Sequence, residues 1–265
     1  MSINRRKFLK IAGLTGLGLS LSARDFILMS PAEASGGHSL PSSGERLGMA
    51  IDVRKLTDAD YARIADACHT VHNVPTLIPE KNNVKNEVKW IWTDTYNHTF
   101  PEQINDYHPE ALRNKTFPLL CNHCDKPPCV RVCPTKATFR AKNGMIVQDP
   151  HRCIGCRFCM AGCPYGSRSF NWVDPRPYIP KRNPDFPTRT IGVVEKCTFC
   201  PERLARGQQP ACVEVSNGAM IFGNLADSHS EIRNILSTHF TLRRKPTLGT
   251  MPSVFYIIGG EDYAG

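Results

Sequence analysis

Two short segments of this 265-residue chain each carry four cysteines, and a proline follows the fourth cysteine in both. The first segment reads CNHCDKPPCVRVCP (residues 121–134) and the second reads CIGCRFCMAGCP (residues 153–164). Eight of the twelve cysteines of the chain lie in these two segments. Because this spacing brings eight reactive side chains together, it constrains the fold more than any other feature of the sequence.

Disulfides and zinc are two alternative roles for so many cysteines. Oxidising compartments favour disulfides, and an even number of cysteines allows complete pairing. A zinc site more often pairs two C-x2-C turns across a longer loop, and it gives no role to the trailing Cys-Pro. The second segment instead has the spacing C-x2-C-x2-C-x3-C-P, which is typical of [4Fe–4S] ligands. The spacing therefore favours iron–sulfur clusters.

Three cysteines of each segment suit one cluster, whereas the fourth points toward a neighbouring cluster. The fourth cysteine lies a helical turn further along the chain, and the proline then ends the helix. The small Gly155 allows the backbone to approach the cluster closely. Two such segments exchange their fourth ligands. This predicts two ligand sets, of which the first is Cys121, Cys124, Cys129 and Cys163 and the second is Cys153, Cys156, Cys159 and Cys133.

The residues around these motifs predict a small α+β unit. Short runs of β-prone residues flank a Lys-Asn-Gly turn, as in a hairpin. A further apolar run near the C-terminus is typical of a core strand. We expect strands at 137–140, 145–148 and 254–258, a turn at 142–144, a matching strand at 168–172, and helical turns at Val130–Cys133 and Phe158–Cys163.

A third group of cysteines is incomplete. Cys197, Cys200 and Cys212 have the spacing of cluster ligands, but Ser216 stands where a fourth cysteine is expected. Either this site lacks a ligand, or its fourth ligand comes from elsewhere. Cys68 is the one cysteine left in the chain. Its alternative role is that of a buried, inert thiol.

These cysteine segments, together with MAIDVRK (49–55) and GAMIFGNL (218–225), resemble the exported iron–sulfur subunits of membrane oxidoreductases. This family comprises the ferredoxin-like partners of polysulfide, tetrathionate and nitrite reductases. The resemblance implies an α+β fold of tandem bacterial-ferredoxin-like [4Fe–4S] units with short strands, short helices and long loops. Members usually carry four cysteine runs and four clusters in two pseudo-symmetric pairs.

The chain departs from this family pattern twice. After IDVRK, the stretch LTDADYARIADAC (56–68) keeps only the last cysteine of the expected run. The second departure is Ser216. The family's exchange of fourth ligands connects these two departures, because the missing N-terminal cysteines and a cysteine at position 216 would have held one and the same cluster. The resemblance leaves Cys68 to complete the set of Cys197, Cys200 and Cys212. The resemblance thus implies three [4Fe–4S] clusters held by all twelve cysteines.

The same resemblance implies two ferredoxin-like halves. Residues 116–184 form a central half with two clusters. Residues 35–115 and 185–265 pair into the other half, in which one cluster is retained and one is lost. Since a gap inside a chain of clusters would impede electron flow, we expect the lost cluster to have been a terminal one.

The N-terminus resembles a Tat-type signal peptide. Paired arginines in NRRKFLK (4–10) precede an apolar run at 11–22 that is too short to span a bilayer, and AEA (32–34) is a small-residue cleavage site. A frayed amphipathic helix is the alternative. We expect residues 1–34 to be a signal peptide, the mature chain to begin at Ser35, and the protein to be periplasmic or extracytoplasmic, peripheral to the cytoplasmic membrane.

The charge and the remaining motifs narrow the function. The net charge is +9, of which five basic and two acidic residues before residue 35 supply +3. No basic helix with interleaved aromatic residues occurs, which disfavours a nucleic-acid partner. No Ser-His-Asp arrangement or phosphate-binding loop stands out, so we assign no catalytic residue. An electron-transfer subunit of an oxidoreductase complex is the expected role.

Other residues near the cysteines have alternative roles. His123 can tune a cluster by hydrogen bonding or can simply pack in its loop. The tryptophans are expected in the core or at interfaces, and His69, His72 and His98 show no metal-site spacing. The basic residues that flank the cysteines either offset cluster charge or are solvated; they are Arg131, Arg152, Arg157, Lys196 and Arg203.

Within the family, GMAIDVRKLTDADY (48–61) and HFTLRRKPTLGTMPSVFYI (239–257) most resemble DsrO-type subunits of DsrMKJOP complexes. This implies three partners, namely an NrfD/PsrC-like integral membrane subunit that interacts with quinone, a multihaem cytochrome c, and the other subunits of a DsrMKJOP-like complex. It also implies a role in dissimilatory sulfur metabolism, such as sulfate reduction. Two alternatives remain: an iron–sulfur subunit of a molybdopterin reductase, and a disulfide-stapled secreted module without iron.

Overall fold

The computed structural model describes residues 44–76 and 86–259 of the chain, all within one compact unit, Ser39–Gly265. The expected signal peptide lies outside the described residues. The strands are β1 (Leu47–Asp52), β2 (Ile91–Thr95), β3 (Thr116–Leu120), β4 (Thr138–Arg140), β5 (Ile146–Gln148), β6 (Ser169–Phe170), β7 (Val194–Glu195), β8 (Met220–Asn224), β9 (Thr241–Leu242) and β10 (Val254–Ile257). The α-helices are α2 (Asp58–Val71), α3 (Tyr96–Thr99), α4 (Glu110–Arg113), α5 (Pro128–Arg131), α6 (Phe158–Ala161), α7 (Pro201–Leu204), α8 (Ala211–Glu214) and α9 (Glu231–Thr238). Single 3₁₀ turns are η1 (Val53–Lys55), η4 (Pro101–Gln103), η5 (Arg176–Tyr178) and η6 (Pro246–Leu248).

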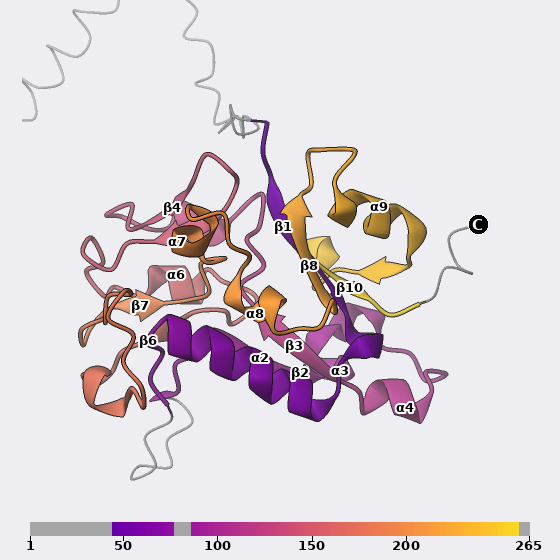
Figure 1. Cartoon of the computed structure of the whole chain (residues 1–265), viewed down its shortest axis with the longest axis horizontal. Coiled ribbons are helices and arrows are strands. Elements are labelled where there is room, and N and C mark those ends of the chain that lie inside the picture. The colour runs from indigo at the N-terminus through magenta and orange to yellow at the C-terminus, as the bar shows by residue number, and fades with distance from the viewer. Residues whose placement is uncertain (1–43, 77–85, 260–265) are drawn as a thin grey trace, which may run out of the picture. The chain divides into compact units, whose positions relative to one another are not determined.

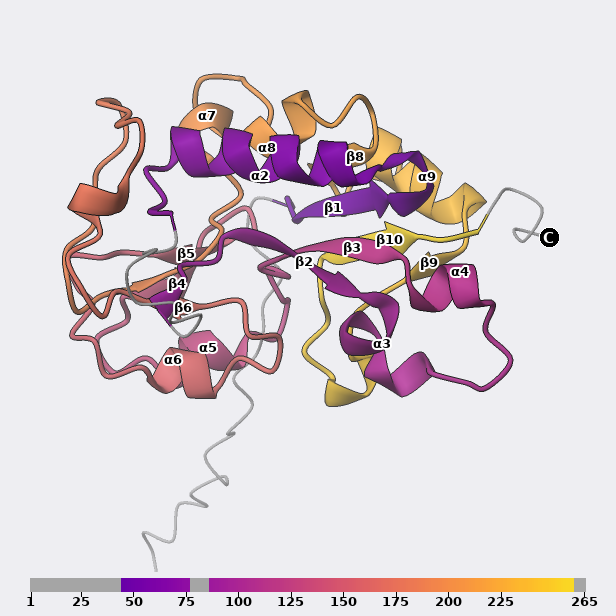
Figure 2. The ribbon, with the colours of Figure 1, turned by 90° about the horizontal axis from the view of Figure 1, so that it is seen from below.

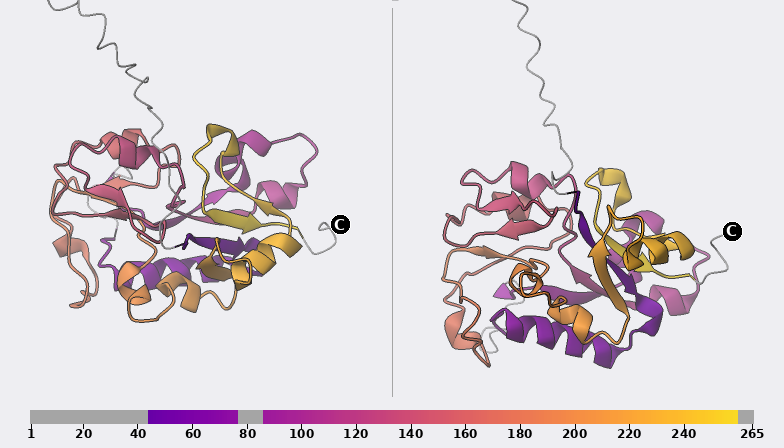
Figure 3. Two further views of the ribbon diagram at one scale, coloured as in Figure 1. Left: turned by 90° about the horizontal axis from the view of Figure 1, so that it is seen from above. Right: turned by 45° about the horizontal axis from the view of Figure 1, so that its top comes forward.

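A four-stranded sheet joins the two ends of the described chain. Its strand order is β8-β1-β10-β9, with β1 antiparallel to β8 and parallel to β10. In Figures 1 and 3 the indigo strand β1 accordingly lies beside orange and yellow C-terminal strands. Met49 and Ile51 face the main core, whereas Ala50 packs with Ile232 of α9. The sheet is therefore covered on both faces.

The central part of the chain contains the predicted hairpin. Strands β4 and β5 pair antiparallel, and each is one residue shorter than expected from the sequence. The strand proposed as their match is reduced to β6, which pairs with β7 instead. Backbone hydrogen bonds continue this pairing beyond the strands, since Asn171 N–H donates to the Val193 carbonyl at 3.0 Å and Gly192 N–H donates to the Asn171 carbonyl at 2.8 Å. The predicted strand near the C-terminus is confirmed as β10.

Two short helices carry the fourth cysteine of each central segment to its position. Helix α5 begins at Pro128, a residue suited to the first turn, and ends two residues before Cys133. Helix α6 likewise ends two residues before Cys163, with Gly162 as its C-cap. A Cβ on Gly162 would lie 3.2 Å from the Val132 side chain. The absence of a side chain at Gly162 thus lets the segments that follow the two helices approach closely.

Helix α2 occupies the stretch where the resemblance led us to expect a first cysteine run. It has 14 residues and begins with a capping box, in which the Asp60 carboxylate accepts a hydrogen bond from the Thr57 backbone N–H at 2.9 Å. Its buried residues are Tyr61, Ile64 and Cys68, which recur at helical spacing. The helix lies along α8, as Figure 2 shows. Among the described residues, no helix has the length and apolar character needed to cross a membrane.

Candidate iron–sulfur sites

All twelve cysteines lie in the described part of the chain, and none of them forms a disulfide bond there. Eight are buried, and the other four are partly exposed: Cys133, Cys153, Cys156 and Cys163. Unpaired cysteines gathered from distant segments are typical of a metal site rather than of a stapled scaffold.

The first set lines one cavity. Cys121, Cys124, Cys129 and Cys163 all border it, and no carboxylate or histidine joins them among its described lining residues. Burial raises the pKa of Cys124 to about 12, and the other three thiolates contribute to this rise. Four thiolates this close need positive charge between them. An all-sulfur donor set of this kind fits a [4Fe–4S] cluster.

The second set lines a separate cavity. Cys133, Cys153, Cys156 and Cys159 border it, again with no carboxylate or histidine among the described lining residues. Burial raises the pKa of Cys133, but backbone N–H groups outweigh it and leave the pKa below its usual value. One of these donors is the N–H of Thr138, which lies 3.4 Å from the Cys133 sulfur. The backbone at this site therefore stabilises a thiolate.

The third set assembles from two distant parts of the chain. Helix α2 places Cys68 beside Cys197, Cys200 and Cys212, and Cys212 lies on α8. Burial raises the pKa of Cys68 well above its usual value, and these three neighbouring thiolates raise it further. Cys68 is only 3% exposed. Without a bound cation, four thiols with such raised pKa values would stay protonated. Four sulfur donors gathered in one buried place are the ligands that a [4Fe–4S] cluster needs.

The third residue of the first C-x2-C turn in each cysteine segment has a left-handed backbone. The φ angles are +42° at His123, +70° at Gly155 and +64° at Phe199. This conformation is uncommon for residues other than glycine. A Cβ on Gly155 would lie 2.3 Å from the Gly192 carbonyl oxygen, so only this turn requires glycine. The sequence indicated the role of Gly155, whereas the other two positions carry no such signal.

Neighbouring cysteines give the order of the three sets. Cys121 of the first set lies close enough to Cys197 of the third set to raise its pKa, after burial. Burial raises the pKa of Cys159 of the second set, and the nearby Cys129 of the first set raises it further. The first set therefore lies near both of the others.

Two buried cations lie among the cysteines. Arg168 is 5% exposed and its Nη1 donates to Thr138 Oγ1 at 3.1 Å and to Gln148 Oε1 at 3.0 Å. Burial lowers its pKa, but the thiolates of Cys129 and Cys159 outweigh this and raise it.

Lys196 is fully buried, and its Nζ donates to the carbonyl oxygens of Ile146 and Cys197. Neither cation belongs to an ion pair within the described residues. Their charge is therefore directed to the cysteine sites. Of the other flanking basic residues, Arg131, Arg152 and Arg157 are exposed and Arg203 pairs with Glu214.

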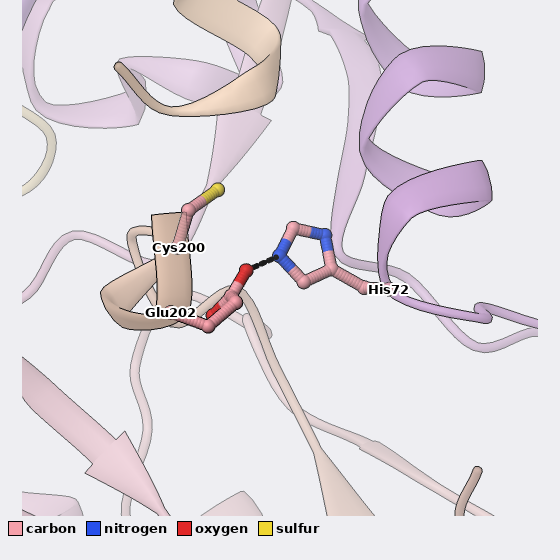
Figure 4. Close-up of side chains that lie close together, drawn as sticks. All are labelled: His72, Cys200 and Glu202. Carbon is pink, nitrogen blue, oxygen red and sulfur yellow. Dashed lines mark hydrogen bonds and ion pairs between the residues drawn. The ribbon is translucent and has the colours of Figure 1, made fainter. Parts of the chain in front are cut away.

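A histidine–glutamate pair borders the third set. His72 Nε2 lies 2.9 Å from Glu202 Oε1, and its Nδ1 donates to the Cys68 carbonyl at 2.7 Å. Figure 4 shows this pair beside the sulfur of Cys200. Since Cys200 already belongs to the third set, the group borders that site and forms no separate metal centre. No pattern in the sequence indicated the pair, because His72 and Glu202 are 130 residues apart.

Ser216, which stands where a fourth cysteine was expected, makes two hydrogen bonds through its hydroxyl. Ser216 is 2% exposed, and its Oγ donates to the Val213 carbonyl at 2.8 Å and accepts from Met220 N–H at 3.0 Å. Both interactions hold the turn between α8 and β8. Ser216 therefore has a local structural role.

Comparison with known proteins supports [4Fe–4S] clusters in this chain. The family model for a 4Fe-4S dicluster domain matches residues 112–176. The chain is 38% identical to the Hdr-like menaquinol oxidoreductase iron-sulfur subunit 1 of Archaeoglobus fulgidus, over 98% of this chain and 100% of that protein. It is 34% identical to the arsenate respiratory reductase iron-sulfur subunit ArrB of Shewanella sp., over 80% and 96%. It is 33% identical to a tetrathionate reductase subunit of Salmonella typhimurium, over 97% and 89%.

Proposed function

We infer the function from a family relationship: the chain belongs to the family of [4Fe–4S] iron–sulfur subunits that includes NrfC and the Salmonella tetrathionate reductase subunit. We propose that this member carries electrons through three [4Fe–4S] clusters. Bound clusters would supply one-electron redox chemistry, while the protein supplies ligands, spacing and nearby charge. The observation that carries the number three is the juxtaposition of Cys68 with Cys197, Cys200 and Cys212.

The order of the cysteine sets supports a linear path. Cysteines of the first set lie near both of the other sets, so we propose that electrons pass the sets in the order second, first, third or the reverse. The family's fourth cluster would have neighboured the third set, beside Ser216. Its loss then shortens the path at one end and leaves no gap within it.

The resemblance to DsrO-type subunits and the names of the similar proteins both bear on which complex contains this protein. We propose a DsrO-like role in a membrane-bound, quinone-linked complex of dissimilatory sulfur metabolism, with an NrfD/PsrC-like membrane subunit and a multihaem cytochrome c as partners. The Archaeoglobus relative is named for a menaquinol oxidoreductase, which supports the link to quinone. The Tat-type signal expected at residues 1–34 supports a location outside the cytoplasmic membrane.

A molybdopterin reductase is the second candidate complex. Relatives named as parts of tetrathionate and polysulfide reductases favour it. Purifying the native complex distinguishes the two proposals. A large molybdopterin-containing subunit would support the second candidate, and a quinone-interacting membrane subunit together with a multihaem cytochrome, without molybdenum, would support the first.

Iron analysis tests the proposed cofactor content directly. The purified protein should contain about twelve irons if each cluster holds four. Its broad visible absorbance should bleach on reduction with dithionite. A colourless protein without iron would refute the proposal, and about eight irons would refute the third cluster alone.

A further inference from the structure

Four large apolar side chains are exposed beside the second cysteine set. Ile154 is 67% exposed, Phe158 59%, Trp172 45% and Ile191 60%. Ile154 lies inside the C-x2-C turn of Cys153 and Cys156. Large apolar side chains gathered on one surface commonly mark an interaction site. We call these four residues the apolar patch.

Backbone and ring contacts place the segments that carry the patch next to one another. A Cβ on Gly155 would lie 2.3 Å from the carbonyl oxygen of Gly192 and 3.3 Å from the Phe170 ring, so these three segments touch. The guanidinium of Arg157 lies 4.7 Å from the Trp172 ring centroid and 5.4 Å from that of Phe170. Arg157 therefore connects the tryptophan to the turn that holds the cysteines.

The patch covers the most accessible cysteine set. Three of the four cysteines of the second set are partly exposed, whereas all four of the third set are buried. The second set also lies at one end of the order described above. Electron transfer between proteins requires their cofactors to approach closely, so a terminal and accessible site is suited to exchange with a partner.

The surroundings of the patch are strongly basic. Residues 126–173 contain eight Lys or Arg and one acidic residue, Asp149. That carboxylate is already paired, since Asp149 Oδ2 lies 3.2 Å from Arg152 Nε. Exposed basic side chains near the second set are Arg131, Lys136, Arg152 and Arg157. An apolar centre with a charged rim has the composition of a protein–protein interface.

We propose that the apolar patch is the port through which the second cluster exchanges electrons with a redox protein whose docking face is acidic around an apolar centre. The proposal rests on the proposed function, because it needs a cluster held by the second set. The basic rim would accelerate encounter with such a partner and fix its orientation, and the apolar patch would bring the cofactors close.

Small inorganic oxidants test the port without a protein partner. The reduced holoprotein is mixed in a stopped-flow instrument with the cobalt(III)–EDTA anion or with the tris(phenanthroline)cobalt(III) cation. The anion should oxidise the protein at a rate that falls with added salt, and the cation at a rate that rises. Arg157→Glu should slow the anion about threefold or more, within the range of electrostatic steering.

Arg233→Glu makes the same charge change on the exposed side of α9 and serves as the matched control, with an expected rate equal to that of the original protein. Ile191→Glu provides a second test, because it lies outside every cysteine motif and also adds negative charge to the patch. The spectrum and iron content of each variant show whether its clusters are intact. Equal effects of Arg157→Glu and Arg233→Glu in intact proteins would overturn the port.

Docking is tested in the native complex. Ile191→Glu should release the chain from its purified complex at a lower salt concentration than Arg233→Glu. Vesicles of phosphatidylglycerol provide the competing outcome: if they bind the holoprotein through the patch and the complex is unaffected, the surface recognises lipid and the proposal is wrong. Absence of iron in the unmodified protein would instead refute the proposed function.

Discussion

The rings of His123 and Phe199 stack face to face, with centroids 3.6 Å apart and planes 8° apart. Each residue occupies the third position of a C-x2-C turn, one in the first cysteine set and one in the third. The pair therefore joins the two turns directly. Burial and the nearby Lys196 hold the pKa of His123 well below its usual value, so the stacked ring is neutral.

This stack should stabilise the contact between the two sets. We expect a coupling of about 1 kcal/mol between His123 and Phe199, as for other buried ring pairs. The variants are His123→Asn, which tolerates the left-handed backbone, Phe199→Leu, and the double mutant. The measurement is the rate at which cluster absorbance disappears in guanidinium chloride. Effects that simply add in the double mutant would show that the rings are not coupled.

The role of Cys68 is tested by its removal. Cys68→Ala should lower the iron content from about twelve to about eight per protein, since one four-iron site loses a ligand. The first and second sets contain no residue of α2 and should keep their clusters. Ser216→Ala is the matched control and should leave iron unchanged, because its hydroxyl bonds only the backbone. Iron content that stays the same in Cys68→Ala would contradict the assignment.

The two buried cations should tune different clusters. A nearby positive charge stabilises the reduced cluster, which is more negative, over the oxidised one. Arg168→Gln should therefore lower the reduction potentials of the first and second clusters, because Arg168 lies near Cys129 and Cys159. Lys196→Met should lower mainly the third, because Lys196 lies at Cys197.

A redox titration followed by electron paramagnetic resonance checks this separation. A tenfold change in the reduction equilibrium of a one-electron couple corresponds to about 59 mV, and we expect shifts of at least this order. The spectra also report whether each variant keeps its clusters. Shifts of the same clusters in both variants would show that the cations act through general structure and not through local charge.

The sequence predicted local features better than distant contacts. Strands β4, β5 and β10 follow from short residue patterns, and the ligand sets were derived from cysteine spacing, which is also local. Ligation itself stays a prediction. By contrast, the stack of His123 on Phe199 and the burial of Arg168 depend on segments far apart in the chain. In the sequence Arg168 resembles any surface arginine, and only the fold places it between two sets of thiolates.

The pairing of β6 with β7 shows the same limit. The sequence predicted a strand at 168–172 but gave no sign of its partner β7, and the Asn171 amide, which donates to the Val193 carbonyl just before β7, is a contact between distant segments. Likewise, the hydrogen-bonded pair of His72 and Glu202 needs the end of α2 to lie against α7. The family comparison supplied what spacing did not, namely the expectation that a residue near position 68 approaches residues 197–212.

Restoring the missing cysteine should not restore the fourth cluster. In Ser216→Cys the new thiol would face a site whose three other ligands are absent, because α2 fills the corresponding stretch with the packed residues Tyr61 and Ile64. Iron should stay at about twelve per protein. Loss of the two hydrogen bonds of the Ser216 hydroxyl should cost about 1–3 kcal/mol, measured as faster cluster loss in denaturant. A gain of about four irons would show that other residues complete the site and that the path of clusters was never shortened.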